Sequence, residues 1–192
     1  PTSRVEGAMS ENTWGPVANR ESWLERADAI LTYHSAGKIV VEEDTDSSRL
    51  MFELASHWIV YDPTYSVEFL AEVNSASHGA GESDTTFPEQ AVVPTDPLVS
   101  IPASNDATIF ETAPGMFVRE YATCYADGAP IGACAAVVNT TSSLMTISGL
   151  TRAYTRTLVH DAALTWAAGG APAWSSPAPS AIAPNTGLIL AE

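Results

Sequence analysis

The sequence predicts an α/β first half with a parallel sheet, followed by an all-β second half with antiparallel strands. In the first half, short apolar runs alternate with helical patterns in the order β-α-β-α-β, which is typical of parallel strands joined by right-handed crossovers. In the second half, short segments rich in Val, Thr and Tyr are separated by Gly, Pro, Ser or Asn, as in an antiparallel sandwich. Residues 74–114 are rich first in Ser and Gly and then in Pro, so we place a boundary near Asp96. The expected domains are residues 1–95 and 96–192.

The first predicted helix covers residues 20–36, where apolar positions fall on one face of a 3.6-residue helix. Asn19 is the expected N-cap and Gly37 the expected stop. By the same reasoning, residues 49–58 form a second helix. The expected extended segments of this half are residues 5–9, 38–43, 59–61 and 65–69.

One turn of the second half brings the two cysteines close together. Asp127-Gly128 favours a tight turn between the first two expected strands. Cys124 and Cys134 flank this turn, so they could face each other across the hairpin. A disulfide would indicate an oxidising compartment, whereas the alternative is two free buried thiols. The expected strands of this half are residues 116–124, 132–139, 144–148, 154–160, 164–167 and 187–191.

The chain is strongly acidic, and most of its charge lies in the first half. It has 23 acidic and 8 basic residues, for a formal net charge of −15. Residues 1–96 hold 17 of the acids and 5 of the bases, while residues 97–192 hold 6 and 3. Because such a chain repels phosphate backbones, we expect no nucleic-acid partner. No apolar run approaches the roughly 20 residues of a membrane span, so we expect no membrane insertion.

Acidic side chains gather where two of the predicted parallel strands end. Glu11 follows the strand at 5–9, and Glu42-Glu43-Asp44-Thr45-Asp46 ends the next strand. Functional groups in parallel α/β sheets collect beyond the carboxyl ends of the strands, so these acids are candidate site residues. Two neighbouring carboxylates differ in pKa, as general acid/base and glycosidic chemistry require. The alternative is that the acids belong to solvated loops.

Trp14 follows Glu11 in a loop that contains Gly15 and Pro16. Sugar rings stack on aromatic faces while acids bind their hydroxyls, so Trp14 is the candidate aromatic for substrate contact. Trp23 and Trp58 lie on the apolar faces of the predicted helices, and we expect both in the core.

The sequence predicts no metal site and no cofactor. Residues 44–48 resemble the start of a calcium loop, but Arg49 stands in place of the required Gly and Ala55 in place of the required Glu. The four histidines lack metal-ligand spacing, and no phosphate-binding loop, Cys-x-x-Cys pair or nucleophile-elbow motif occurs. Asn139-Thr140-Thr141 fits a glycosylation sequon, a pattern that often occurs by chance.

Several segments resemble a family of bacterial glycoside hydrolases. Residues 5–11, Val-Glu-Gly-Ala-Met-Ser-Glu, are similar to the strand end Asp-Gly-(Ala/Val)-Met-x-Glu of the hypothetical glycosyl hydrolase-like family fifteen. Glu6 stands where that family has Asp. Further similar segments follow in the family's order, at residues 36–41, 51–56, 117–121, 136–140 and 186–190.

The resemblance implies the last βα units of a (β/α)8 TIM barrel followed by an antiparallel β-sandwich. It also implies a secreted bacterial hydrolase whose substrate is a carbohydrate. Glu11 would then be a catalytic carboxylate, with Glu42 and Asp44 as further catalytic acids. The residues expected to bind substrate are Glu6, Asn12, Trp14 and Glu43.

A TIM barrel takes roughly 250 residues, so the resemblance implies that the 192-residue chain is the C-terminal fragment of the enzyme. The partner carboxylate would lie in the missing part, and the isolated chain is therefore expected to be inactive. One alternative is a non-catalytic carbohydrate-binding or cell-surface module whose acids only increase solubility. Another is a small, complete α/β domain, which predicts a covered sheet edge at residues 5–9.

Overall fold

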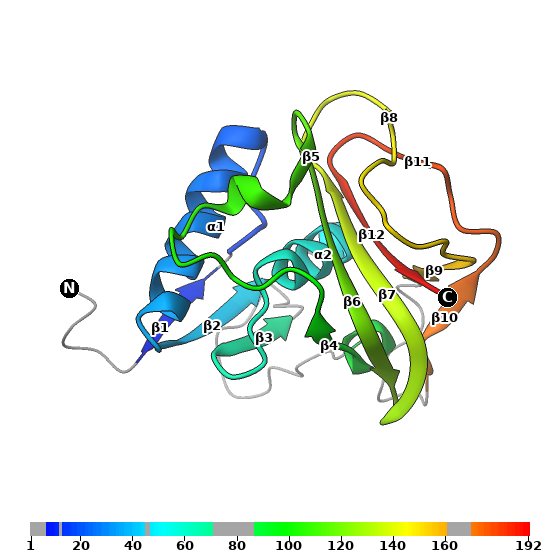
Figure 1. Cartoon of the computed structure of the whole chain (residues 1–192), viewed down its shortest axis with the longest axis horizontal. Helices are drawn as coiled ribbons and strands as arrows, with labels where there is room; N and C mark the ends of the chain where they lie inside the picture. Colours follow the sequence, from blue (N-terminus) through cyan, green and yellow to red (C-terminus); the bar gives the residue numbers. More distant parts are fainter. Residues whose placement is uncertain (1–6, 12, 45–46, 71–86, 161–169) are drawn as a thin grey trace, which may run out of the picture.

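The computed structural model describes residues 7–11, 13–44, 47–70, 87–160 and 170–192 (Figure 1). The first half forms a three-stranded parallel sheet with the strand order β1-β2-β3. Its elements are β1 (Gly7–Glu11), α1 (Arg20–Ser35), β2 (Ile39–Asp44), α2 (Leu50–Val60) and β3 (Ser66–Leu70), and a short 3-10 helix (Ser47–Arg49) leads into α2.

The ends of α1 are those that the sequence predicts. The Asn19 side chain accepts a hydrogen bond of 2.9 Å from the Ser22 backbone N–H, and the Ser22 hydroxyl returns a bond to the Asn19 backbone. Gly37 follows the helix with φ of 65°, a conformation that glycine adopts without strain. The end of α2 differs from the expectation, because Ile59 and Val60 belong to the helix and are fully buried.

The second half is antiparallel, as expected. Its seven-stranded sheet has the order β10-β9-β12-β7-β6-β4, with β5 also paired to β6, and β11 and β8 form a separate two-stranded sheet. The strands are β4 (Val92–Pro97), β5 (Glu111–Ala113), β6 (Met116–Ala126), β7 (Ala129–Asn139), β8 (Met145–Thr146), β9 (Arg156–Val159), β10 (Ala173–Ser175), β11 (Ala181–Ile182) and β12 (Thr186–Ala191). Two further 3-10 helices are Pro88–Ala91 and Ala107–Phe110.

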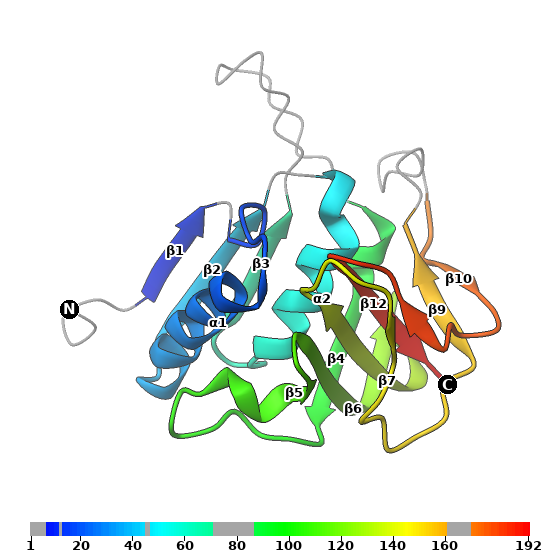
Figure 2. The same cartoon turned by 90° about the horizontal axis from the view of Figure 1, so that it is seen from above.

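Helix α2 lies between the two sheets (Figure 2) and packs against β12, β7 and β6. Nearly every residue of α2 is buried, which explains why its sequence is apolar on all sides. One continuous hydrophobic cluster therefore contains residues from both halves of the chain. Trp23 of α1, for example, stacks on Phe117 of β6 with ring centroids 3.9 Å apart. Asp96, where we expected a domain boundary, lies within β4.

The expectation of TIM-barrel units followed by a β-sandwich is wrong. In the described part of the chain there are two α-helices, and most of the strands are antiparallel. In a TIM barrel the helices form an outer ring over parallel strands. Here α2 covers one face of the antiparallel sheet instead. The prediction failed because a β-α-β-α-β order indicates how neighbouring strands pair. It does not indicate which element packs on the other side of each helix.

The disulfide between Cys124 and Cys134 is confirmed, and it joins β6 to β7. Asn139 of the sequon is fully buried, and its side-chain amide donates to the carbonyl oxygens of Ser143 and Ala183 at 2.8 and 2.9 Å. A glycan has no access to that nitrogen in the folded chain. Among the described helices, neither has the length and apolar character needed to cross a membrane.

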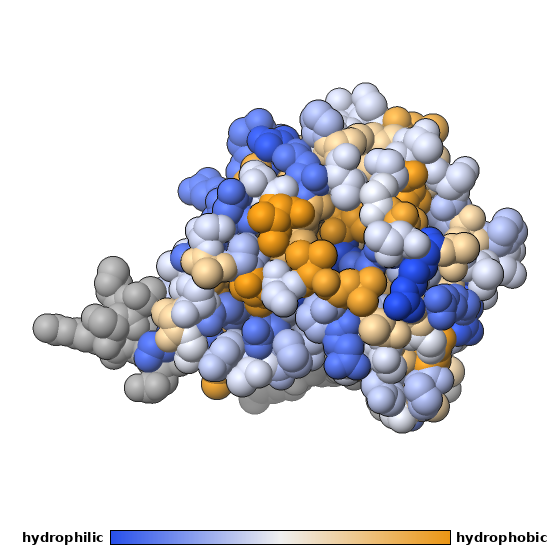
Figure 3. Space-filling model, in the orientation of Figure 1, coloured by the Kyte–Doolittle hydropathy of each residue, from blue (hydrophilic) through white to orange (hydrophobic). Residues whose placement is uncertain are grey.

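Among the exposed apolar side chains of the described residues, two groups lie close to the parallel sheet and to the segment between β4 and β5. On the parallel sheet, β1 pairs with β2 alone among the described strands, and Met9 is 60% exposed. The covered edge that a complete small domain predicts at residues 5–9 is thus not seen in the described part. The second group lies in the segment between β4 and β5, where Figure 3 shows an apolar patch; its exposed side chains are Leu98, Val99 and Ile109.

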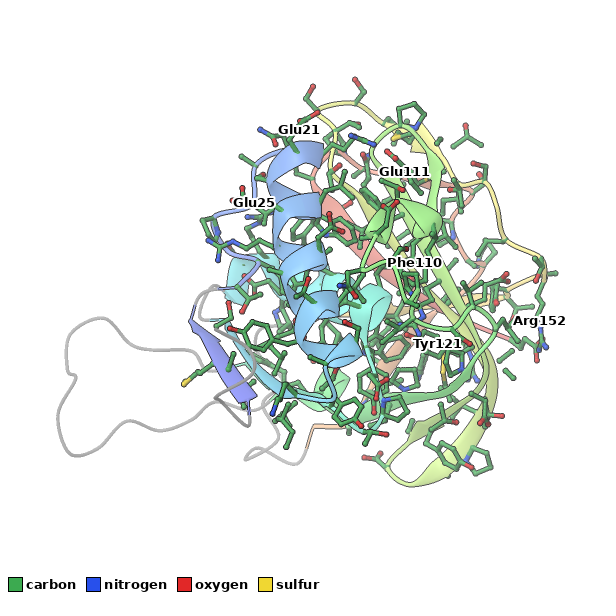
Figure 4. The ribbon with its side chains drawn as sticks, turned by 60° about the vertical axis from the view of Figure 1, so that its left-hand side comes forward. Glu21, Glu25, Phe110, Glu111, Tyr121 and Arg152 are labelled. Atoms are coloured by element: carbon green, nitrogen blue, oxygen red, sulfur yellow. A yellow bond between two sulfur atoms is a disulfide. The ribbon has the colours of Figure 1, made fainter. Side chains whose placement is uncertain are left out.

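An ion pair fastens the beginning of α1 to the β5–β6 turn. Arg20 makes two hydrogen bonds, of 2.5 and 2.7 Å, to the Glu111 carboxylate (labelled in Figure 4). The same carboxylate accepts the Gly115 backbone N–H at 2.7 Å. The hydrogen bond from Arg20 is the main cause that lowers the pKa of Glu111. Glu21 and Glu25 lie further along α1 and are exposed.

The carboxyl end of α2 is bound by two side chains of β6. The Arg119 guanidinium is buried and donates to the carbonyl oxygens of Ile59 at 2.9 Å and Tyr61 at 2.7 Å. The Tyr121 hydroxyl donates to the carbonyl oxygen of Trp58. The last carbonyls of a helix have no partner within the helix and carry partial negative charge. A cation and a hydroxyl from β6 satisfy them, and this joins the first half of the chain to the second.

We predict that Arg119→Met destabilises the protein by about 3 kcal/mol, because it leaves buried carbonyl oxygens without donors. Urea unfolding followed by circular dichroism measures this change. Arg152→Met is the matched control, because the Arg152 side chain is 37% exposed and its ion pair with Glu192 is at the surface. Equal stability of the two variants would contradict a structural role for Arg119.

Candidate functional site

The acids predicted from the sequence lie at the carboxyl ends of β1 and β2. In the parallel register, the Cα atom of Ser10 pairs with that of Glu42, and Glu11 pairs with Glu43. Glu11 is the last residue of β1 and Asp44 the last of β2. The structure describes the backbone of Glu11, Glu43 and Asp44 but not their side chains, and Glu6 and Asn12 lie outside the described residues.

Glu42 differs from its neighbours because its carboxylate is completely buried. Strand alternation places it on the same face of β2 as buried Val40, toward the helices. Its Oε2 accepts a hydrogen bond of 2.8 Å from Trp14 Nε1, and its Oε1 lies 3.0 Å from His57 Nδ1. A buried carboxylate needs such donors, because isolated burial of its charge is very costly. Glu42 therefore connects the loop after β1 with β2 and α2.

Trp14, which we expected to contact substrate, has no exposed surface. Its ring stacks on Trp23 at 5.6 Å between centroids, while its N–H points to Glu42. Arg49 holds the loop around it by donating to the carbonyl oxygens of Gly15 and Val17. In this arrangement, Trp14 positions an acid and offers no face to a sugar ring.

His57 is the functional residue that sequence reasoning missed. It lies on α2 with 3% of its surface exposed. The alternation of side chains along β2 could have indicated such a residue. It turns Glu42 inward, and a buried carboxylate requires a donor or a cation from the helix that it faces. His57 is the basic residue in the last turn of α2, and its Nδ1 lies 3.0 Å from Glu42 Oε1, close enough to pair with the carboxylate when the imidazole is protonated.

A small cavity of about 190 Å³ lies next to His57, between α2, β3 and β4. Its polar lining comes from His57, Tyr61, Ser66 and Gln90. Burial, and to a smaller degree the charge of Asp62, raises the pKa of Tyr61, so its hydroxyl stays protonated at neutral pH. Within the described ranges, no group of three His, Cys, Asp or Glu side chains is arranged to hold a metal ion.

Comparisons with known proteins found no family model that matches the chain and no curated protein that matches it. The resemblance to glycosyl hydrolase-like family fifteen therefore stays a prediction. What the chain does must be inferred from its own geometry.

We predict that Trp14→Phe destabilises the protein by about 2 kcal/mol, since it removes the donor to a buried carboxylate. Trp23→Phe is the matched control: Trp23 is also fully buried, but its Nε1 donates to the neutral Ser56 hydroxyl at 2.9 Å. We expect the control to lose about half as much, because bonds to charged groups are stronger. Chemical denaturation of both variants measures the difference. A Trp14 variant that is the more stable of the two would contradict this role.

Proposed function

We propose that this chain is a glycoside hydrolase whose two catalytic carboxylates are Glu11 and Glu43. The observation that supports this is the parallel register, which pairs these two positions at the carboxyl ends of β1 and β2. Neighbouring strands are about 4.8 Å apart. The two carboxyl groups of a retaining glycosidase are separated by about 5–5.5 Å. In this proposal the nucleophile and the acid/base therefore come from adjacent strands.

The other acids have supporting roles in this proposal. Glu42 has its carboxylate occupied by Trp14 and His57, so it serves to position the end of β2. The second catalytic acid in this proposal is therefore Glu43, in place of the expected Glu42. We assign to Asp44, the last residue of β2, the binding of sugar hydroxyls. A carbohydrate substrate suits a strongly acidic chain, because neutral sugars are not repelled as phosphates are.

The compartment is part of the same proposal. The Cys124–Cys134 disulfide supports an oxidising environment, since disulfides persist outside the reducing cytosol. A secreted bacterial enzyme meets this condition. The expected inactivity of the isolated chain depended on the TIM-barrel expectation, which the fold contradicts, so activity is assayed on this chain directly.

The test is hydrolysis of a panel of p-nitrophenyl glycosides by the chain, measured as kcat/KM. Glu11→Gln and Glu43→Gln should each lower kcat/KM by at least about 100-fold, because each removes a group that carries a proton or a bond. Glu25→Gln is the control, since Glu25 is exposed on α1 (Figure 4) and should change nothing.

Three outcomes would overturn the proposal. Near-normal turnover by Glu11→Gln would show that the paired acids are not the catalytic ones. Binding of oligosaccharides in calorimetry without hydrolysis of any glycoside would instead favour the non-catalytic carbohydrate-binding module, and neither binding nor hydrolysis would exclude both.

A further inference from the structure

Ser66 lines the cavity beside His57, and behind it lies a buried histidine, His34, within hydrogen-bond distance. Ser66 is the first residue of β3, and its Oγ lies 3.2 Å from Nε2 of His34 on α1. His34 is 4% exposed, while Ser66 is half-buried and lines the cavity of about 190 Å³. A hydroxyl within reach of an imidazole, at the wall of a cavity, is the basic requirement of nucleophilic catalysis.

The surroundings of Ser66 fix its hydroxyl in place. The Asp62 backbone N–H donates to Ser66 Oγ at 2.9 Å, and the Ser66 N–H donates to the Asp62 carbonyl oxygen at 2.9 Å. With one lone pair of Oγ occupied by the Asp62 N–H, activation of the hydroxyl requires the His34 tautomer whose Nε2 accepts the hydroxyl proton of Ser66. The Asp62 N–H also favours negative charge that develops on Oγ as its proton leaves.

The same cavity contains a donor for a developing oxyanion. Gln90 lines it, and Gln90 Oε1 accepts the Phe87 backbone N–H at 2.8 Å. Because the amide oxygen is used in this way, the orientation of the side chain is set and its NH₂ group is the remaining donor. The Tyr61 hydroxyl lines the same cavity and is a second donor.

We propose that Ser66 is a nucleophile, with His34 as its general base, for transfer of short acyl groups from esters. Ser66 Oγ forms a bond to the acyl carbon, the ester C–O bond breaks, and the hydroxyl proton passes to His34 Nε2 and then to the departing alcohol. Water cleaves the acyl-serine in a second step, releases the acid and restores Ser66. The volume of the cavity limits the acyl group to a few carbon atoms. This activity is separate from the acid pair of β1 and β2.

Charges around His34 set the pH at which it acts. Burial is the largest effect and lowers the pKa of His34 below its ordinary 6.5, and His57 acts in the same direction. Glu42, Asp62 and the Val60 carbonyl act against it. The imidazole is therefore neutral and basic at pH 7. The rate should fall with decreasing pH as His34 becomes protonated, and the midpoint of this fall should lie below the ordinary pKa of a histidine.

The experiment has two readouts on the full chain. The first is hydrolysis of p-nitrophenyl acetate, which Ser66→Ala and His34→Gln should each lower by about 100-fold. The second is methanesulfonyl fluoride, which forms an Oγ–S bond and releases fluoride, followed by mass-spectrometric mapping of the modified residue. The wild type should be modified at Ser66, whereas a purely structural hydroxyl, without a general base, would stay unmodified.

Ser100→Ala is the matched control, because Ser100 is exposed, and it should behave as the wild type in both readouts. Thermal unfolding followed by circular dichroism identifies any variant that fails to fold. In that case, the position of the sulfonyl group on the wild-type chain, located by mass spectrometry, tests the proposal. Modification at Lys38, the single lysine, or at the amino terminus in place of Ser66 would overturn the proposal. So would hydrolysis by Ser66→Ala at the wild-type rate.

Discussion

A carboxylate that is fully buried must be paired, and in this chain that constraint falls on Glu42. It draws Trp14 inward from the loop after β1 and His57 inward from α2. Without a buried acid to pair with, neither side chain would have to be buried. Tryptophan is common at ligand-binding surfaces, and histidine is common at exposed helix ends. The position of β2 relative to α2 follows from this pairing, and so does the place where the remaining acids gather.

The second constraint is the burial of α2 on all sides. A helix between two sheets cannot satisfy its last carbonyls with water, so β6 supplies Arg119 and Tyr121 for them. This contact joins segments about sixty residues apart in the chain. It also brings Phe117 of β6 onto Trp23 of α1, so the aromatic core crosses from one half to the other.

Local features could be predicted from the sequence, and long-range ones could not. Asn19, Gly37 and the cysteine pair were predicted correctly because capping, turn chemistry and hairpin spacing involve only neighbouring residues. The acids were placed correctly at strand ends, but Glu42 could not be distinguished from Glu43 before the register of β1 and β2 was known. The prediction of TIM-barrel units was wrong because α2 packs on an antiparallel sheet built from residues 92–191. No local sequence pattern encodes that contact.

Trp14 holds Glu42 at the carboxyl end of the parallel sheet, and the indole N–H resonances of ¹⁵N-labelled protein report on this contact. In Glu42→Gln, we expect a large shift and faster hydrogen exchange for the Trp14 signal, because its charged acceptor is gone. The signal of Trp23, which donates to Ser56, should stay in place. If the Trp14 N–H exchanges in the wild type as fast as an exposed indole and does not respond to the substitution, Trp14 does not hold Glu42.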